Sequence, residues 1–336
     1  MTATSREDKS DDHSPLLEAR NLSITYASTS GPVRAVDNVS FIVRKGEVLG
    51  LAGESGCGKT SVALSLMRLH GPKTRIEGEI LFHGKNVLRM TRAELQAYRW
   101  RDVSMIPQGS MNALDPVMTI QRQIVEAIQG HTRKSSSEAA QMTKRLLTSV
   151  SIAPSRAHDY PHEFSGGMKQ RAVIAMALAL EPQLVIADEP TTALDVIVQR
   201  QLLNLLKYLR EELMISFIFV SHDLSVIGEI ADRVAVMYAG KIVEIGTRDA
   251  ILNHPSHPYT EALVKSVPRV FGKREELTPI PGDPPTGLWP TGCSFNPRCK
   301  YAFNLCRVKE PQLQQSPSGS DAACHLIDNG NKSLTR

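Results

Sequence analysis

One stretch, Gly53-Glu54-Ser55-Gly56-Cys57-Gly58-Lys59-Thr60, restricts the possible folds more than any other part of the chain. It fits the pattern G-x-x-x-x-G-K-[ST], whose successive backbone N–H groups cradle the phosphates of a nucleotide. In such loops the lysine reaches the β- and γ-phosphates, and the last hydroxyl binds Mg²⁺. A buried strand is predicted over 47–52, and apolar spacing predicts a helix from Ser61 to His70. This order of elements forms an anion site, which disfavours the alternative of a glycine-rich turn without a ligand.

Length and composition set broad limits on the protein. With 336 residues, of which 41% are hydrophobic, the chain can bury a full core, and its length predicts about two domains. The net charge of +4 is too small to indicate nucleic acid or a membrane surface as a partner. No run approaches the ~18–20 apolar residues of a membrane helix. The polar segment 1–14 has no secretory pattern, so we expect a cytoplasmic protein, with disorder in 1–14 and in the tail 328–336.

Strand-like and helix-like runs alternate between residues 16 and 252, which predicts an α/β fold. Early strands alternate apolar and polar residues, as an antiparallel sheet with one wet face requires, whereas Leu184–Ala187 and Phe217–Val220 are apolar throughout and predict buried parallel strands. A helical subdomain is expected over about 117–164. Proline and glycine become frequent after Asn253, so we predict one domain over 15–253 and a loop-rich extension over 254–327. The other predicted strands are Leu22–Tyr26, Val33–Val43, Ile76–Phe82, Val103–Pro107, Ile215–Val220, Val234–Tyr238 and Ile242–Ile245.

Two acids, Asp188 and Glu189, follow one of these apolar strands. An acid at the end of a parallel strand beside a phosphate loop can hold Mg²⁺ through water, which we expect of Asp188. The next acid, Glu189, is placed to orient and deprotonate an attacking water. A strand end with two solvated acids is the alternative, and the upstream loop makes it the weaker one.

A second phosphate-binding helix start is predicted at Ser165-Gly166-Gly167. Ser165 is a good N-cap, and the glycines allow the backbone to approach a phosphate closely. Taken alone, the stretch fits a plain capped helix equally well. One nucleotide cannot easily occupy both helix starts of one monomer, so we expect a head-to-tail dimer. Each ATP would lie between Lys59 and the partner subunit's Ser165.

With these motifs in order, residues 16–252 resemble the nucleotide-binding subunits of ATP-binding cassette (ABC) transporters. The resemblance implies a P-loop ATPase with a mixed core sheet, an antiparallel β subdomain and a helical subdomain. It implies that Tyr26 stacks on adenine, that Gln108 contacts Mg²⁺ and senses the γ-phosphate, and that His222 hydrogen-bonds the γ-phosphate. Asp195 would lie at the dimer interface. The motifs are Tyr26, Gly53–Thr60, Gln108, Ser165-Gly166-Gly167, Asp188-Glu189, Ala193-Leu194-Asp195 and His222.

Without the resemblance, each of three residues has an ordinary interpretation. Tyr26 would be a core or rim tyrosine, Gln108 a glutamine without special role, and His222 a solvated histidine. The chain also departs from the family pattern, which usually begins its signature with Leu and ends it with Gln. Here Phe164 and Met168 occupy those positions. Ser165 and both glycines remain, so we expect the phosphate contact to persist.

Further segments resemble the ATPases of oligopeptide and dipeptide importers: Ser110–Ile120, His254–Thr260, Pro279–Gly282 and the cysteines that follow. The resemblance implies import of peptides, although related members import nickel, glutathione or oligosaccharides. It also implies two membrane-spanning permease subunits, a second and different ATP-binding subunit, and an extracytoplasmic solute-binding protein. The chain would then be peripheral, at the cytoplasmic face of the inner membrane.

Four cysteines, Cys293, Cys299, Cys306 and Cys324, follow the spacing C-x₅-C-x₆-C-x₁₇-C. In a cytoplasmic chain such clustering favours a metal site over disulfides. Four thiolates can hold a [4Fe–4S] cluster or zinc, and the tight pairs that zinc favours are absent, so the cluster is preferred over zinc or free thiols. The resemblance implies the same cluster. For His254 and His257 we expect a turn and a helix start rather than a metal site.

Two other classes fit less well. A DNA-repair or chromosome ATPase carries a long coiled coil or zinc module between the loop and the signature, and residues 108–165 are too few for either. The charge also lacks a nucleic-acid footprint, so no nucleic-acid partner is expected. A non-transport regulatory protein would be expected to have lost the Asp188-Glu189 pair.

Overall fold

The computed structural model describes residues 14–29, 31–109, 113–266, 280–285 and 289–328. Part of the segment Ser110–Ile120, the prolines Pro268 and Pro279, and most residues of the two predicted disordered ends therefore lie outside the described residues. Among the described helices, none is long and apolar enough to cross a membrane.

A four-stranded antiparallel sheet forms the first layer, in the order β2-β1-β4-β5. Its alternating sequence gives one buried face: Leu22 and Ile24 of the central strand are fully buried, as the pattern predicts. The antiparallel arrangement expected for the early strands is thus confirmed. The strands are β1 (Leu17–Tyr26), β2 (Val33–Val43), β4 (Arg75–Phe82) and β5 (Lys85–Asn86).

The second layer is an eight-stranded sheet in the order β11-β12-β10-β9-β3-β8-β7-β6. Neighbours from β6 to β9 are parallel, while β10, β12 and β11 pair antiparallel. Every residue of β7 and β8 is buried, which confirms the prediction for the two apolar runs. The strands are β3 (Val48–Ala52), β6 (Val103–Ile106), β7 (Leu184–Asp188), β8 (Ser216–Ser221), β9 (Arg233–Tyr238), β10 (Lys241–Thr247), β11 (Gln314–Gln315) and β12 (Asp321–Ala322).

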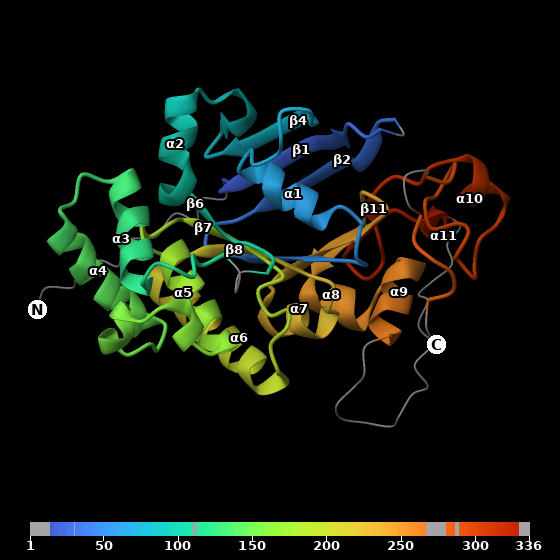
Figure 1. The fold of residues 1–336 in the computed structure, drawn as a ribbon. Helices are drawn as coiled ribbons and strands as arrows, with labels where there is room; N and C mark the ends of the chain where they lie inside the picture. The colour runs from blue at the N-terminus through green and yellow to red at the C-terminus, as the bar shows by residue number, and fades with distance from the viewer. Residues whose placement is uncertain (1–13, 30, 110–112, 267–279, 286–288, 329–336) are drawn as a thin grey trace, which may run out of the picture.

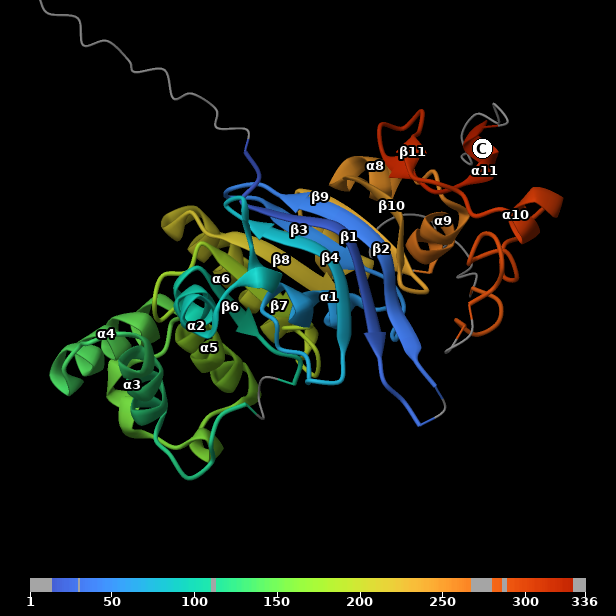
Figure 2. The same cartoon turned by 90° about the horizontal axis from the view of Figure 1, so that it is seen from above.

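Helices cover both faces of this sheet (Figure 1). α1 lies between the two sheets, where Val62 and Leu66 join one core cluster, and α5, α6 and α7 pack on the opposite face in a second cluster. α3 and α4 lie at one end of the molecule and α10 and α11 at the other (Figure 2). The helices are α1 (Lys59–Leu66), α2 (Arg92–Arg101), α3 (Ile120–His131), α4 (Ser136–Ser149), α5 (Gly166–Ala177), α6 (Val196–Leu213), α7 (Leu224–Ile230), α8 (Arg248–Asn253), α9 (Pro258–Lys265), α10 (Asn304–Val308) and α11 (His325–Asp328), with 3₁₀ turns at Val87–Arg89, Pro154–His158 and Pro161–Glu163.

The first helix is shorter than the apolar spacing predicts. α1 ends at Leu66, Arg68 adopts a left-handed φ of 49°, and Leu69 is 44% exposed rather than buried. The side chain of Arg68 donates to the carbonyl oxygen of Met90 at 2.7 Å. A left-handed residue cannot continue a right-handed helix, so the prediction of a helix to His70 is wrong at its last turn.

The C-terminal extension is built into the main sheet. β12 pairs with β10 at Glu244 and Ala322. Tyr259 and Phe295 belong to the same core cluster as Val185 of β7 and Phe217 of β8. Glu244 is fully buried and accepts hydrogen bonds from Ser320 Oγ and from backbone N–H groups at distances of 2.7–2.9 Å. Burial raises the pKa of this carboxyl against the opposing effect of those bonds. The proline-rich composition gave no sign of this attachment.

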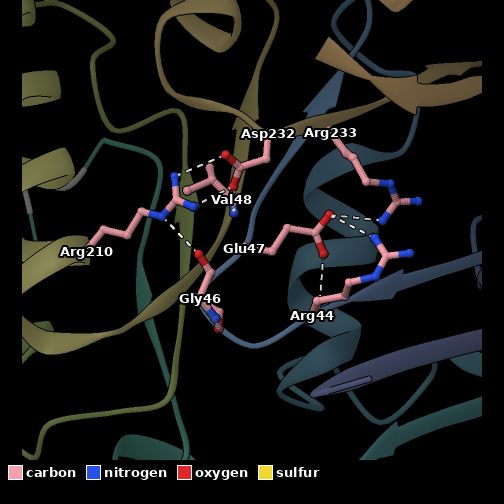
Figure 3. Close-up of polar contacts among 8 residues, drawn as sticks. Arg44, Gly46, Glu47, Val48, Arg210, Asp232 and Arg233 are labelled. Atoms are coloured by element: carbon pink, nitrogen blue, oxygen red, sulfur yellow. Dashed lines mark hydrogen bonds and ion pairs between the residues drawn. The ribbon is translucent and has the colours of Figure 1, made fainter. Parts of the chain in front are cut away.

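Ion pairs fix the start of β3, the strand that leads into the glycine loop (Figure 3). Glu47 is 7% exposed and lies 3.0 Å from Arg233 Nη1. Asp232 accepts the backbone N–H of Val48 at 2.8 Å and Arg210 Nη2 at 2.7 Å. Carboxylates from the strand start and from the residue before β9 thereby hold β3 in register with its neighbours.

Candidate nucleotide site

The glycine loop connects β3 to α1 and forms one wall of an open cavity of about 200 Å³. Gly58 has φ 104°, and a Cβ there would lie 2.5 Å from the carbonyl oxygen of Ala35. A Cβ on Gly53 would lie 2.2 Å from the carbonyl oxygen of Met237. Only glycine fits these two positions. The cavity is lined by Ala35, Ser55, Gly56, Gly58, Lys59, Thr60, Ser61, Gln108 and Glu189, so the loop, Gln108 and Glu189 meet as predicted.

Lys59 places a cation on the loop. Its Nζ donates to the carbonyl oxygens of Gly53 at 2.7 Å and Glu54 at 2.9 Å, and the residue is only 5% exposed. Cys57 Sγ lies 3.6 Å from the same nitrogen, and burial raises the pKa of this thiol. A lysine held in this way presents a point charge to an anion in the cavity.

A magnesium ion is the group that Thr60 and Asp188 fit. Thr60 Oγ1 donates to Asp188 Oδ1 at 3.3 Å. Asp188 is 1% exposed, and its Oδ2 has no hydrogen-bond partner among the described residues. Burial raises the pKa of this carboxyl. A buried oxygen without a partner needs one, and a hydrated divalent cation beside a hydroxyl supplies it.

Glu189 receives side-chain donors from two directions. Gln108 Nε2 donates to its Oε2 at 3.0 Å, and His222 Nδ1 lies 3.1 Å from its Oε1. These residues follow β6, β7 and β8, which are neighbouring parallel strands, so their carboxyl ends bring the side chains together. Glu189 itself has a left-handed φ of 49°, an uncommon conformation for a residue other than glycine.

Hydrogen bonding keeps Glu189 ionised. Partial burial raises the pKa of this carboxyl, but hydrogen bonds from His222 and Thr192 outweigh that effect and lower it overall. The Thr192 hydroxyl donates to Oε2 at 3.1 Å. The sequence did not single out Thr192; its position three residues after an acid at a strand end was the only available signal.

The signature turn at the start of α5 is open to solvent. Ser165 is the N-cap and accepts the Met168 N–H at 3.4 Å. A Cβ on Gly167 would lie 2.7 Å from Val198 Cγ1, so glycine lets α5 approach α6. Ser165, Gly166 and Gly167 are not among the residues that line the described cavity around Lys59. This separation is the one expected if a second subunit completes the site.

Arg156 accommodates the two departures from the signature pattern. Phe164 is 4% exposed, and the guanidinium of Arg156 lies 5.1 Å from its ring centroid. The same arginine contacts Met168 Sδ at 4.0 Å and donates to the carbonyl oxygen of Glu163 at 2.9 Å. The substituted residues are therefore packed, and the serine keeps its capping geometry.

Asp195 and Tyr26 lie outside this cavity. Asp195 caps α6 by accepting the N–H groups of Ile197 and Val198 at 3.0 and 2.9 Å, next to an apolar surface in which Val196 is 80% exposed. Tyr26 Oη donates to Ser61 Oγ at 3.0 Å at the start of α1. Tyr26 therefore lies beside the first turn of α1, the helix that follows the glycine loop.

The four cysteines of the extension line one small cavity, together with His257 and His325. All four are free thiols, and burial first, then the neighbouring thiols, raises the pKa of Cys293 to about 11 and that of Cys324 to about 12. In the part of the chain that the structure describes, no group of three or more His, Cys, Asp or Glu residues is placed to hold a metal ion. His257 caps α9 through Nδ1, 3.0 Å from the Tyr259 N–H, which confirms the predicted helix start.

Comparison with known proteins agrees with these motifs. A family model described as "ABC transporter" matches residues 36–192, and one described as "Oligopeptide/dipeptide transporter, C-terminal region" matches 243–306. The oligopeptide transport ATP-binding protein OppD of Haemophilus influenzae is 42% identical over 93% of this chain and 97% of its own length. The dipeptide transport ATP-binding protein DppD of Bacillus subtilis is 45% identical over 93% and 95%. A dimeric structure of MJ0796, a bacterial ABC transporter cassette, superposes with a TM-score of 0.62 at 26% identity, over 69% of this chain and 98% of that one.

Proposed function

Because this chain belongs to the ATP-binding proteins of peptide ABC transporters, we propose that it hydrolyses ATP to energise the import of dipeptides and oligopeptides. The observation that carries the proposal is Glu189 held between Gln108 and His222 at the edge of the phosphate-loop cavity. In the proposal Glu189 is an ionised base, Gln108 a metal-binding amide and His222 an imidazole donor, and all three act at the γ-phosphate.

In the proposed reaction Lys59 binds the β- and γ-phosphates, and the N–H groups of the glycine loop hold the remaining oxygens. Glu189 accepts a proton from a water that attacks the γ-phosphorus, and the bond from phosphorus to the bridging oxygen breaks to leave ADP and phosphate. Thr60, Asp188 and Gln108 would hold Mg²⁺, which would neutralise phosphate charge. Gln108 uses its amide nitrogen for Glu189, and its amide oxygen is the atom that a metal would bind. His222 would donate to the γ-phosphate.

We assign the outer half of the site to a second subunit. The exposed signature turn at Ser165 and the exposed apolar residues beside Asp195 would face the partner. Tyr26 would stack on the adenine of the nucleotide bound at this chain's own glycine loop. The dimeric structure of the similar cassette supports this arrangement. We further propose that the second ATP-binding subunit is a different chain, as the peptide-importer resemblance implies.

A groove beside Gln108 is our candidate for the contact with the membrane subunits. A cavity of about 570 Å³ lies between the end of α1, α2, β6 and α3. Its wall includes Pro107, the residue before Gln108, and Trp100, whose φ of 73° interrupts α2. A short permease helix bound here would contact the segment that carries the γ-phosphate sensor. The proposal places the chain peripherally at the cytoplasmic face of the inner membrane, with two permease subunits and an external solute-binding protein.

We also propose that Cys293, Cys299, Cys306 and Cys324 hold a [4Fe–4S] cluster. The support is that all four thiols line one small cavity and that four cysteines are the ligand set of such a cluster. A cluster presents several irons to several thiolates, and its role here would be structural. Anaerobic purification should give a brown protein with iron and sulfide in equal amounts; stoichiometric zinc without iron would contradict the proposal.

We also propose the division of the chain that the change in composition after Asn253 predicts. Residues 15–253 would form the nucleotide-binding domain, with a helical subdomain over about 117–164, and residues 254–327 would form the extension, which Glu244 and β12 attach to the main sheet.

Co-purification and reconstitution test the function. Detergent-solubilised membranes should yield permease subunits bound to the chain, and the reconstituted complex should hydrolyse ATP faster when solute-binding protein and peptide are present. If nickel, glutathione or an oligosaccharide stimulates ATP hydrolysis and peptides do not, the proposed substrate is wrong but the role as a transport ATPase stands. Retention of DNA in place of permease subunits would contradict the transport proposal itself.

A further inference from the structure

An arginine of the C-terminal extension contacts the phosphate loop directly. Arg298 Nη1 donates to Glu54 Oε2 at 2.7 Å, and Nη2 donates to Glu54 Oε1 at 3.0 Å. The two residues are 244 positions apart in the chain. The Arg298 side chain is 6% exposed and that of Glu54 24%. A bidentate pair of this burial is both stronger and geometrically more specific than an exposed ion pair.

The same loop residue is also held through its backbone. The Glu54 N–H donates to Tyr259 Oη at 2.9 Å, and Tyr259 is fully buried at the start of α9. Tyr259, Tyr238 and Phe295 pack together, with ring centroids 4.7–5.4 Å apart. Extension residues therefore fix both the side chain and the main chain of Glu54.

Arg298 is in turn fixed by its own segment. Its Nε donates to the carbonyl oxygen of Pro281 at 2.8 Å. Its backbone N–H donates to the carbonyl oxygen of Phe295 at 3.0 Å. Burial lowers the pKa of Arg298, but hydrogen bonds to Glu54 and Tyr238 raise it by more, so the guanidinium stays charged. Cys299 follows it directly, and Phe295 lines the cavity of the four thiols. The segment that shapes this cavity is thus the one that carries the arginine.

Charge explains why the pair matters for a nucleotide. Glu54 is an acid within a loop that binds phosphates, and its carbonyl oxygen accepts a hydrogen bond from Lys59. An unpaired carboxylate here would repel the phosphates and compete for the lysine. Arg298 neutralises that carboxylate and keeps it turned toward the extension.

We propose that Arg298 is a positioning residue for ATP binding, through which the packing around the four-thiol cavity is coupled to the phosphate loop. The proposal rests on nucleotide binding at this loop, as inferred above. Coupling between two sites is reciprocal, so nucleotide bound at the loop must also stabilise the Arg298 segment.

Equilibrium ATP binding to the purified chain tests the charge argument. Arg298→Gln should weaken binding by roughly 10-fold, within the usual range for coupled sites. The double variant Arg298→Gln with Glu54→Gln should recover most of the lost affinity, because the unpaired carboxylate is gone. The matched control is Arg307→Gln, an exposed arginine of the same extension, which should leave the affinity unchanged. Equal weakening in the single and double variants would overturn the proposal, since damage to the fold predicts no rescue.

Hydrogen exchange tests the coupling. A non-hydrolysable ATP analogue should slow amide exchange over residues 293–299 in the wild-type chain, and this slowing should be lost in Arg298→Gln at a nucleotide concentration that saturates both proteins. Equal protection in both would contradict the coupling. Failure of the wild-type chain to bind ATP would instead count against the proposed function, so the two failures are distinguishable.

Discussion

His222 Nδ1 lies 3.1 Å from Glu189 Oε1, which joins the ends of two neighbouring parallel strands, β8 and β7. The glutamate side chain is 11% exposed and the histidine side chain 54%. The acid is therefore enclosed, while the imidazole remains open to solvent. This contact is one of those that lower the pKa of Glu189 and keep it in the form that can accept a proton.

Replacing His222 should shift the pH dependence of hydrolysis. In His222→Gln the donor that lowers the pKa of Glu189 is weakened, so this pKa rises. Because the base acts only when ionised, the acidic limb of the pH–rate profile should move to higher pH. The measurement is ATP turnover against pH in the assembled transporter. His254→Gln, at an exposed helix end, is the control and should leave the profile in place. A loss of rate that is uniform across all pH values would show that His222 does not act through Glu189.

Removing Asp232 should destabilise the strand that leads into the loop. Asp232→Ala leaves the Val48 N–H without its acceptor and Arg210 without its carboxylate (Figure 3). We expect a loss of about 1–2 kcal/mol in the free energy of unfolding, because the Val48 N–H loses its acceptor while the partly exposed ion pair with Arg210 adds little. Urea unfolding measures it. Asp283→Ala, at an exposed site, should change stability by less than about 0.5 kcal/mol. Equal stabilities for the two variants would contradict the role given to Asp232.

The buried His257 should make the fold sensitive to acid. Burial lowers the pKa of His257 to about 3, from an ordinary value of 6.5. The unfolded chain then binds the proton more readily than the folded one, so stability falls as the pH drops from 6.5 toward 3. His257→Asn keeps a capping side chain and removes this titration, so its urea midpoint should depend less on pH over that window. The exposed His254→Asn should behave like the wild type. A wild-type slope in His257→Asn would show that other groups cause the acid sensitivity.

The nucleotide site was largely predictable because its parts are local. Each motif lies at the end of an apolar run, and parallel strands bring Gln108, Glu189 and His222 to one edge once the fold class is known. The end of α1 was not predictable, because the spacing of Leu69 continues a helix that a left-handed Arg68 interrupts. Arg298 and Tyr259 were missed for a related reason: their contacts with Glu54 are set by tertiary packing. Thr192 was missed although its partner Glu189 is only three residues away. A contact between residues 244 positions apart leaves no local pattern.

The central claim is that Glu189 is the base whose action on ATP drives transport, and the substitution Glu189→Gln tests it most directly. The amide keeps the size of the side chain and one acceptor oxygen, but it cannot accept the proton from water. In the reconstituted transporter, ATP binding should be retained while turnover falls by roughly 10²–10⁴, the scale for losing a general base, and peptide uptake should stop with it. Near-normal turnover and uptake in this variant would contradict the account.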